Sequence, residues 1–372
     1  MPAKRTGNWT RWSRDRAIVA NGGLADPAQA GRFEERAWEI VAELYTETRD
    51  RHRQSDFADR FDRLSLLYIN NTAANAIAIE RNGHRAVGVY IGLLRRLWAA
   101  FQLGLSRADF LEDAFDSPPI VLGDGDPASM LEPEFLSRLP SADWPEDRRS
   151  ALWDLFRRAI MFFLCHELGH HARGHIDLVQ DRLGLDSIDE LRAAEADGPD
   201  RRLLRMLEFD ADTDAIDMIL IAETQEAKRE GWSLDKTEAQ GFQWLVAIAT
   251  LFLALDIEHR PVLDQYQGSH PAPVHRAIHA ISTFARSYAA EFGWDDEHKQ
   301  FYEEEAWGAA SVIAEALGFP EGRWHGEHTL LMDLDRFAVE ETAFLEFTEW
   351  LTRSNEDKPA AEPAWMQAPL PG

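Results

Sequence analysis

The stretch that decides the fold and the chemistry of this chain is His166-Glu167-Leu168-Gly169-His170, which follows a run of apolar residues. The apolar lead predicts a helix, and residues four apart on a helix lie on one face. His166 and His170 can therefore direct two imidazole nitrogens to one zinc ion, with Glu167 beside them to hold and deprotonate a water. Two buried histidines bonded to backbone carbonyls are the alternative, so a third ligand is needed to decide.

A third histidine could come from the residues just downstream. Zinc peptidases of the metzincin class have the pattern H-E-x-x-H-x-x-G-x-x-H. In this chain Gly174 comes one position late and His175 one position early, so the metzincin pattern does not fit. We therefore expect His175 and His171 to be surface residues or to lie behind the metal ligands.

A glutamate from a later helix is the second option. Glu208 and Asp212 are four apart in a segment flanked by apolar side chains, so they share a helical face. Glu208 can complete a three-ligand zinc site that keeps one position open for water. Asp212 can accept a hydrogen bond from the outer nitrogen of a ligating histidine and so fix the orientation of the ring. The alternative is an acidic helical face exposed to solvent.

Together these motifs resemble a known group of peptidases. H-E-x-x-H followed by Glu208-Phe209-Asp210-Ala211-Asp212 is similar to the pattern of gluzincins of the HtpX and CaaX-prenyl-protease (Ste) type. Residues 75–94 resemble that group's N-A-x-A hairpin and G-L-L helix start, and residues 269–276 resemble its [ST]-H-P-x-x-x-x-R element. Lit-type phage-exclusion peptidases have a similar soluble plan and are a second relative.

The resemblance implies an α+β fold that is mostly α-helical. Its core would be gluzincin-like, with a small mixed β-sheet beside the H-E-x-x-H helix and extra helices at both ends. His270 would donate to the oxyanion of the tetrahedral intermediate, and Arg276 would pair with Asp212 or another carboxylate near the site. The alternatives are a turn residue for His270 and a surface position for Arg276. One strand would present an open edge to the substrate backbone: Val87, Gly88, Val89 and Tyr90.

Composition limits the partners and the compartment. The 372-residue chain carries a formal net charge of -26, which repels phosphate and anionic lipid, so we expect no nucleic-acid partner and no docking on anionic membranes. The single cysteine, Cys165, excludes an intrachain disulfide and favours a reducing cytoplasm, and we interpret it as a small core residue. The longest apolar run, residues 244–255, is too short to cross a bilayer and predicts a core helix.

Spacing and composition predict the organisation of the chain. Apolar periodicity predicts helices over about 32–53, 92–101, 146–171, 201–229, 244–257, 276–292 and 300–317. Asn82-Gly83 predicts a hairpin turn. We expect a helical lead-in at 1–64, a metallopeptidase domain at 65–290 with an irregular insertion at 105–150, a helical extension at 291–352 and a disordered tail at 353–372.

These features predict a soluble, cytoplasmic zinc endopeptidase that acts on protein or peptide substrates and binds one zinc ion per chain. Zinc would bring the pKa of its water near neutrality, and Glu167 would take the proton and later pass it to the leaving amine. Two alternatives stay open. One is a latent phage-defence or stress-response protease that a partner protein activates, and the other is a zinc-containing binding module without catalysis.

Overall fold

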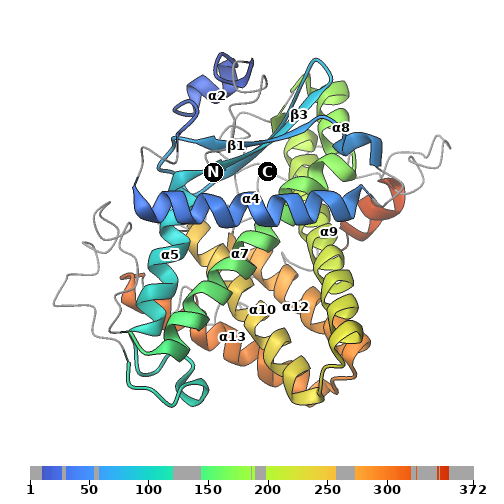
Figure 1. The fold of residues 1–372 in the computed structure, drawn as a ribbon. Coiled ribbons are helices and arrows are strands. Elements are labelled where there is room, and N and C mark those ends of the chain that lie inside the picture. Colours follow the sequence, from blue (N-terminus) through green and yellow to red (C-terminus); the bar gives the residue numbers. More distant parts are fainter. Residues whose placement is uncertain are drawn as a thin grey trace.

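The computed structural model describes residues 11–26, 31–53, 58–119, 144–185, 187–188, 198–256, 273–319, 324, 342 and 344–351. These residues form a body of long helices with one small mixed sheet above it (Figure 1). The fold is α+β and mostly helical, as predicted. The centre of the 105–150 insertion, His270 and the tail from residue 353 lie outside the described residues.

The helices agree with the apolar periodicity of the sequence. They are α2 (Arg16–Ala20), α4 (Arg32–His52), α5 (Ile91–Leu105), α7 (Glu146–Ala172), α8 (His175–Leu183), α9 (Gly198–Glu230), α10 (Leu234–Leu255), α12 (Pro273–Phe292) and α13 (Asp296–Ala316). Short 3-10 turns lie at Ala58–Phe61 and Glu112–Ala114, and residues 344–351 are also helical. The seven predicted helices correspond to α4, α5, α7, α9, α10, α12 and α13, whereas α2 and α8 were not predicted.

The sheet contains β1 (Leu64–Ile69), β2 (Ala76–Arg81), β3 (His84–Tyr90) and β4 (Ser187–Ile188) in the order β1-β3-β2-β4. β2 and β3 form an antiparallel hairpin, and its turn holds Asn82 at φ 52° and Gly83 at φ 70°. Both values lie in the left-handed region that a two-residue type I′ turn requires, so the predicted turn is confirmed. β1 runs parallel to β3, and β4 pairs antiparallel with β2.

The open edge predicted at β3 is wrong. Val87, Gly88 and Val89 pair with β1 on one side and with β2 on the other, while Tyr90 pairs with β1 and donates to the carbonyl of Asn75. The backbone groups of this interior strand are therefore already used in two ladders, and a substrate strand cannot add to it. The prediction came from the family resemblance, and it failed because β1 lies beside β3 in a parallel pairing.

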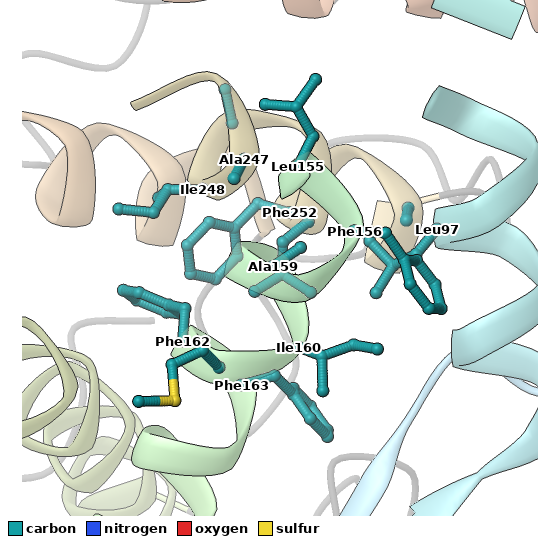
Figure 2. Close-up of a cluster of buried hydrophobic side chains, with 14 of the residues drawn as sticks. Leu97, Leu155, Phe156, Ala159, Ile160, Phe162, Phe163, Ala247, Ile248 and Phe252 are labelled. Atoms are coloured by element: carbon teal, nitrogen blue, oxygen red, sulfur yellow. The ribbon is translucent and has the colours of Figure 1, made fainter. Parts of the chain in front are cut away.

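α7 is the central helix, and its last half is buried on every side. All residues from Ala159 to Ala172 are buried, which is typical of a core helix and not of a surface helix. Figure 2 shows Phe162 of α7 beside Phe252 of α10, and their ring centroids are 5.9 Å apart. Cys165 is fully buried, as expected of a small core residue. The core therefore surrounds the segment that carries the H-E-x-x-H motif.

α10 is the one described helix that is long and apolar enough to cross a membrane. Within this fold, 67% of its most apolar window is buried. The run from Trp244 to Ala254 is buried throughout, and α10 packs against α7, α12 and α13. These contacts confirm the prediction of a core helix.

The described residues of the predicted helical lead-in, 1–64, pack into the body of the protein. Trp12 and Ile18 are buried in a cluster with Ile77 and Ile79 of β2. The largest core cluster joins residues of α4, α7, α10 and α13, so the proposed lead-in, peptidase domain and extension share one core. A second cluster packs residues 344–351 against α8 and the start of α9.

Candidate metal centre

Two helices bring the three predicted ligands together. His166 and His170 lie on α7 and Glu208 lies on α9, and their ligand atoms are all within 4.8 Å of one another. The two Nε2 atoms are 3.1 Å apart, and Oε2 and Oε1 of Glu208 lie 3.4 Å and 3.6 Å from His166 Nε2 and His170 Nε2. All three side chains are buried. Among the described residues, no other cluster of histidine, cysteine and acidic side chains has this geometry.

Asp212 and Arg276 lie directly behind these ligands. Asp212 Oδ1 is 2.8 Å from Nδ1 of His166. The Arg276 guanidinium donates to both oxygens of Asp212, from Nη2 at 2.7 Å and from Nε at 2.8 Å, and its Nη1 lies 2.9 Å from Glu208 Oε2. The structure therefore places Arg276 in the site, paired with Asp212, and not on the surface.

The buried charges make this cluster attractive to a cation. Burial raises the pKa of Asp212, but the Arg276 guanidinium outweighs it and the net pKa is lowered, so the carboxylate is ionised. Burial and Arg276 lower the pKa of His166, but Asp212 and Glu208 outweigh them and raise it to about 10. Burial and the neighbouring His166 ring hold the pKa of His170 well below its usual range. The carboxylates of Asp212 and Glu208 thus favour a single positive charge at the two imidazole rings of His166 and His170.

Gly169 lets the two helices approach closely at this point. A Cβ atom at Gly169 would lie 3.1 Å from Oδ2 of Asp214, which belongs to α9. The close contact brings the ligand-bearing turns of α7 and α9 face to face. Burial also raises the pKa of Asp214 to about 7. Glu167, the predicted general base, is 6% exposed and follows His166 on the same turn.

A second group of side chains behind His170 was only partly expected. Nδ1 of His170 is 2.9 Å from Nδ1 of His175, and Nε2 of His175 is 2.9 Å from Oδ2 of Asp210. Arg173 donates to both oxygens of Asp210, at 2.8 Å and 3.1 Å. Of the two alternatives for His175, the position behind the ligands is confirmed and the surface position is wrong, since its exposure is 0%.

Helical spacing could not have found this contact. Gly174 has φ 76° and separates α7 from α8, so the chain turns and brings His175 back against His170. Asp210 lies only two residues after Glu208, which points it about 200° around α9. His171 has a separate role: its Nε2 lies 3.1 Å from the carbonyl oxygen of Ala86, which ties α7 to β3.

Comparison with known proteins agrees with a peptidase. The family model described as Peptidase U49 matches residues 127–294, a range that contains the whole cluster described above. The match supports a peptidase, and hence a hydrolase with protein or peptide substrates, and it favours the Lit-type resemblance over the HtpX and CaaX-prenyl-protease resemblance. No curated protein and no solved structure matches the chain.

The residues present fit a divalent metal ion. Two imidazoles and one carboxylate are a donor set found in catalytic zinc sites. The outer nitrogen of each ring is already engaged, His166 Nδ1 with Asp212 and His170 Nδ1 with His175. Each Nε2 is therefore the nitrogen that faces the other ligands, as metal binding requires.

Proposed function

We propose that this protein is a soluble, cytoplasmic, zinc-dependent endopeptidase with one metal centre per chain. The observation that carries the proposal is the convergence of His166, His170 and Glu208, with Glu167 next to the first ligand, inside the segment that matches a peptidase family. Each residue supplies a group that peptide hydrolysis at a metal needs, and the carboxylate of Glu167 would be unnecessary at a binding-only site.

The residues have separate tasks in this proposal. A bound zinc ion would supply Lewis-acid chemistry, which acidifies a water and polarises the substrate carbonyl. Glu167 takes a proton from the attacking water and delivers it to the leaving amine. Arg276 keeps Asp212 and Glu208 in place through its three short contacts. His270, which lies outside the described residues, is proposed as the donor to the oxyanion.

Two variants test the ligands and the base separately. Glu167→Gln should retain the metal and lose peptide cleavage, whereas Glu208→Ala should lose the metal itself. Glu230→Ala, at the exposed far end of α9, is the control for loss of a glutamate from the same helix. Zinc content by elemental analysis and cleavage of a peptide library would be measured on purified protein. Wild-type cleavage by Glu167→Gln, or full zinc retention by Glu208→Ala, would refute the mechanism.

Substrates can be sought in cells with the same pair of proteins. Newly formed protein N-termini would be profiled in cells that express the wild type or Glu167→Gln. Termini that appear only with the wild type identify cleaved proteins and the residues around the cleaved bond. Because both proteins fold around the same metal site, differences between the two profiles report catalysis and not the presence of the protein.

A second proposal concerns when the enzyme is active. The three ligands are only 1–2% exposed, and the matching family favours the Lit-type resemblance. Both observations favour a latent protease that a partner protein or phage component opens. Purified protein should then cleave casein poorly and gain activity in extracts of infected cells. Rapid cleavage of casein without any addition would exclude latency, and stoichiometric zinc without turnover under either condition would favour a binding module.

A further inference from the structure

Three side chains form a hydrogen-bonded chain behind one metal ligand. It runs from Arg173 through Asp210 and His175 to His170, with contacts of 2.8 Å, 2.9 Å and 2.9 Å. Arg173 is 26% exposed at its side chain, whereas Asp210, His175 and His170 are almost completely buried. Since the buried groups lie away from bulk water, the hydrogen-bond partners of each group determine which of its atoms carries a proton.

The positions of the protons in this hydrogen-bonded chain follow from the Asp210 carboxylate. Arg173 donates to both oxygens of Asp210, so Asp210 is paired as a carboxylate and can only accept. His175 must therefore carry a proton on Nε2 and donate it to Asp210. Nδ1 of His175 faces Nδ1 of His170 at 2.9 Å, so one of these two nitrogens carries the proton and the other accepts it.

Nε2 of His170 lies 3.1 Å from His166 Nε2 and 3.6 Å from Glu208 Oε1, so it is the nitrogen placed to bind a metal and needs its lone pair for that. His170 then carries its proton on Nδ1 and donates it to Nδ1 of His175, which leaves His175 with a single proton, on Nε2. The opposite tautomer of His175 would place two donors against each other or leave Asp210 without its hydrogen bond.

We propose that His175 and Asp210 are positioning residues of the metal centre: Asp210 sets the tautomer of His175, and His175 sets that of His170, so that Nε2 of His170 faces the metal. The inference rests on the proposed metallopeptidase function. His166 is held differently, because its Nδ1 contacts the Asp212 carboxylate directly at 2.8 Å. His166 is thus oriented by a charged acceptor, the Asp212 carboxylate. His170 is oriented by a neutral acceptor, His175, whose tautomer the Asp210 carboxylate sets.

The test compares zinc affinity among variants of the full-length protein. His175→Phe removes the acceptor while keeping a buried ring, and we expect zinc affinity to fall about 10- to 100-fold. His175→Gln offers an amide oxygen in place of Nδ1, so it should recover most of the affinity. His171→Phe is the matched control, because it removes an equally buried histidine that contacts Ala86 and not the ligands. Its zinc affinity should stay at the wild-type level in competition with a chelator.

A direct spectroscopic readout covers the case in which His175→Phe does not fold. In full-length wild type labelled with ¹⁵N at histidine, His175 should be neutral with its proton on Nε2, and His170 should carry its proton on Nδ1. A proton on Nδ1 of His175 would overturn the inference, as would equal zinc affinity of His175→Phe and wild type, or no recovery in His175→Gln. If wild type itself binds no zinc, the proposed function fails. If wild type binds zinc and the His175 variants bind it equally well, only the positioning role of His175 and Asp210 fails.

Discussion

Nδ1 of His166 lies 2.8 Å from Oδ1 of Asp212, so a buried carboxylate from α9 orients a predicted metal ligand on α7. We predict that Asp212→Asn lowers zinc affinity about 10-fold or more, because the neutral amide holds the imidazole less strongly. Zinc competition with a chelator measures the change. Asp62→Asn, an exposed carboxylate paired with Arg53, controls for the loss of one charge from the whole protein. Equal affinities of the two variants would show that Asp212 does not support the ligand.

Arg276 should contribute more to the stability of the metal-free protein than to that of the zinc-loaded protein. Its guanidinium compensates Asp212 and Glu208, which are both buried, and Arg276→Met would leave those charges without it. We expect the free energy of unfolding to fall by about 3–5 kcal/mol in the presence of a chelator. Zinc supplies a replacement positive charge, so saturating zinc should recover part of the loss in urea denaturation.

Arg158 provides the matched control for Arg276. It is also largely buried, pairs with Glu223 at 3.6 Å and lies over the ring of Trp244, but it is remote from the ligands. Arg158→Met should therefore cost similar stability with zinc and with chelator. A zinc effect of the same size in both variants would contradict the electrostatic role assigned to Arg276.

The sequence predicted the local features of this fold and not its long-range pairings. The periodicity of α4 and the Asn82-Gly83 turn depend on neighbouring residues, and both agree with the structure. The position of β1 depends on a parallel pairing in which Leu64 lies opposite Arg85. A single sequence contains no local signal for that contact, so nothing in it could correct the edge position that the family resemblance implied for β3.

The features of the site also fall into local ones that the sequence predicts and long-range ones that it does not. Four-residue helical spacing was enough to pair His166 with His170 and Glu208 with Asp212, because each pair lies on one helix face. The contact between His175 and Asp210 instead depends on the left-handed turn at Gly174 and on how α7 packs against α9. Only the three-dimensional packing of the two helices could reveal it.

Asp214 predicts a pH dependence of stability. Burial raises its pKa from 3.8 to about 7, so the folded chain binds this proton more tightly than the unfolded chain does. The stabilisation is complete below about pH 4 and is lost as the pH rises through about 7. Asp214→Asn cannot ionise, so at pH 8 it should be more stable than wild type by roughly 2 kcal/mol, since partial exposure screens part of the cost.

Unfolding of both Asp214 proteins would be followed in urea at pH 5 and pH 8, with chelator present so that metal binding does not contribute. The advantage of Asp214→Asn should be small at pH 5 and clear at pH 8. An advantage that grows as the pH falls would have the wrong sign and would show that Asp214 is ionised and stabilising in the folded protein.

Gly92 and Gly308 should respond in opposite ways to alanine. A Cβ atom at Gly92 would lie 2.1 Å from the carbonyl oxygen of Thr72, and the Gly92 amide donates to the carbonyl of Asn71 at 2.8 Å, so backbone would have to move. Gly308 lies within α13 and a Cβ there meets nothing within 4 Å. We expect Gly92→Ala to cost about 3 kcal/mol and Gly308→Ala to stabilise by about 0.5–1 kcal/mol, as measured by urea denaturation. A stable Gly92→Ala protein would show that the start of α5 can move away from residue 72 without loss of the fold.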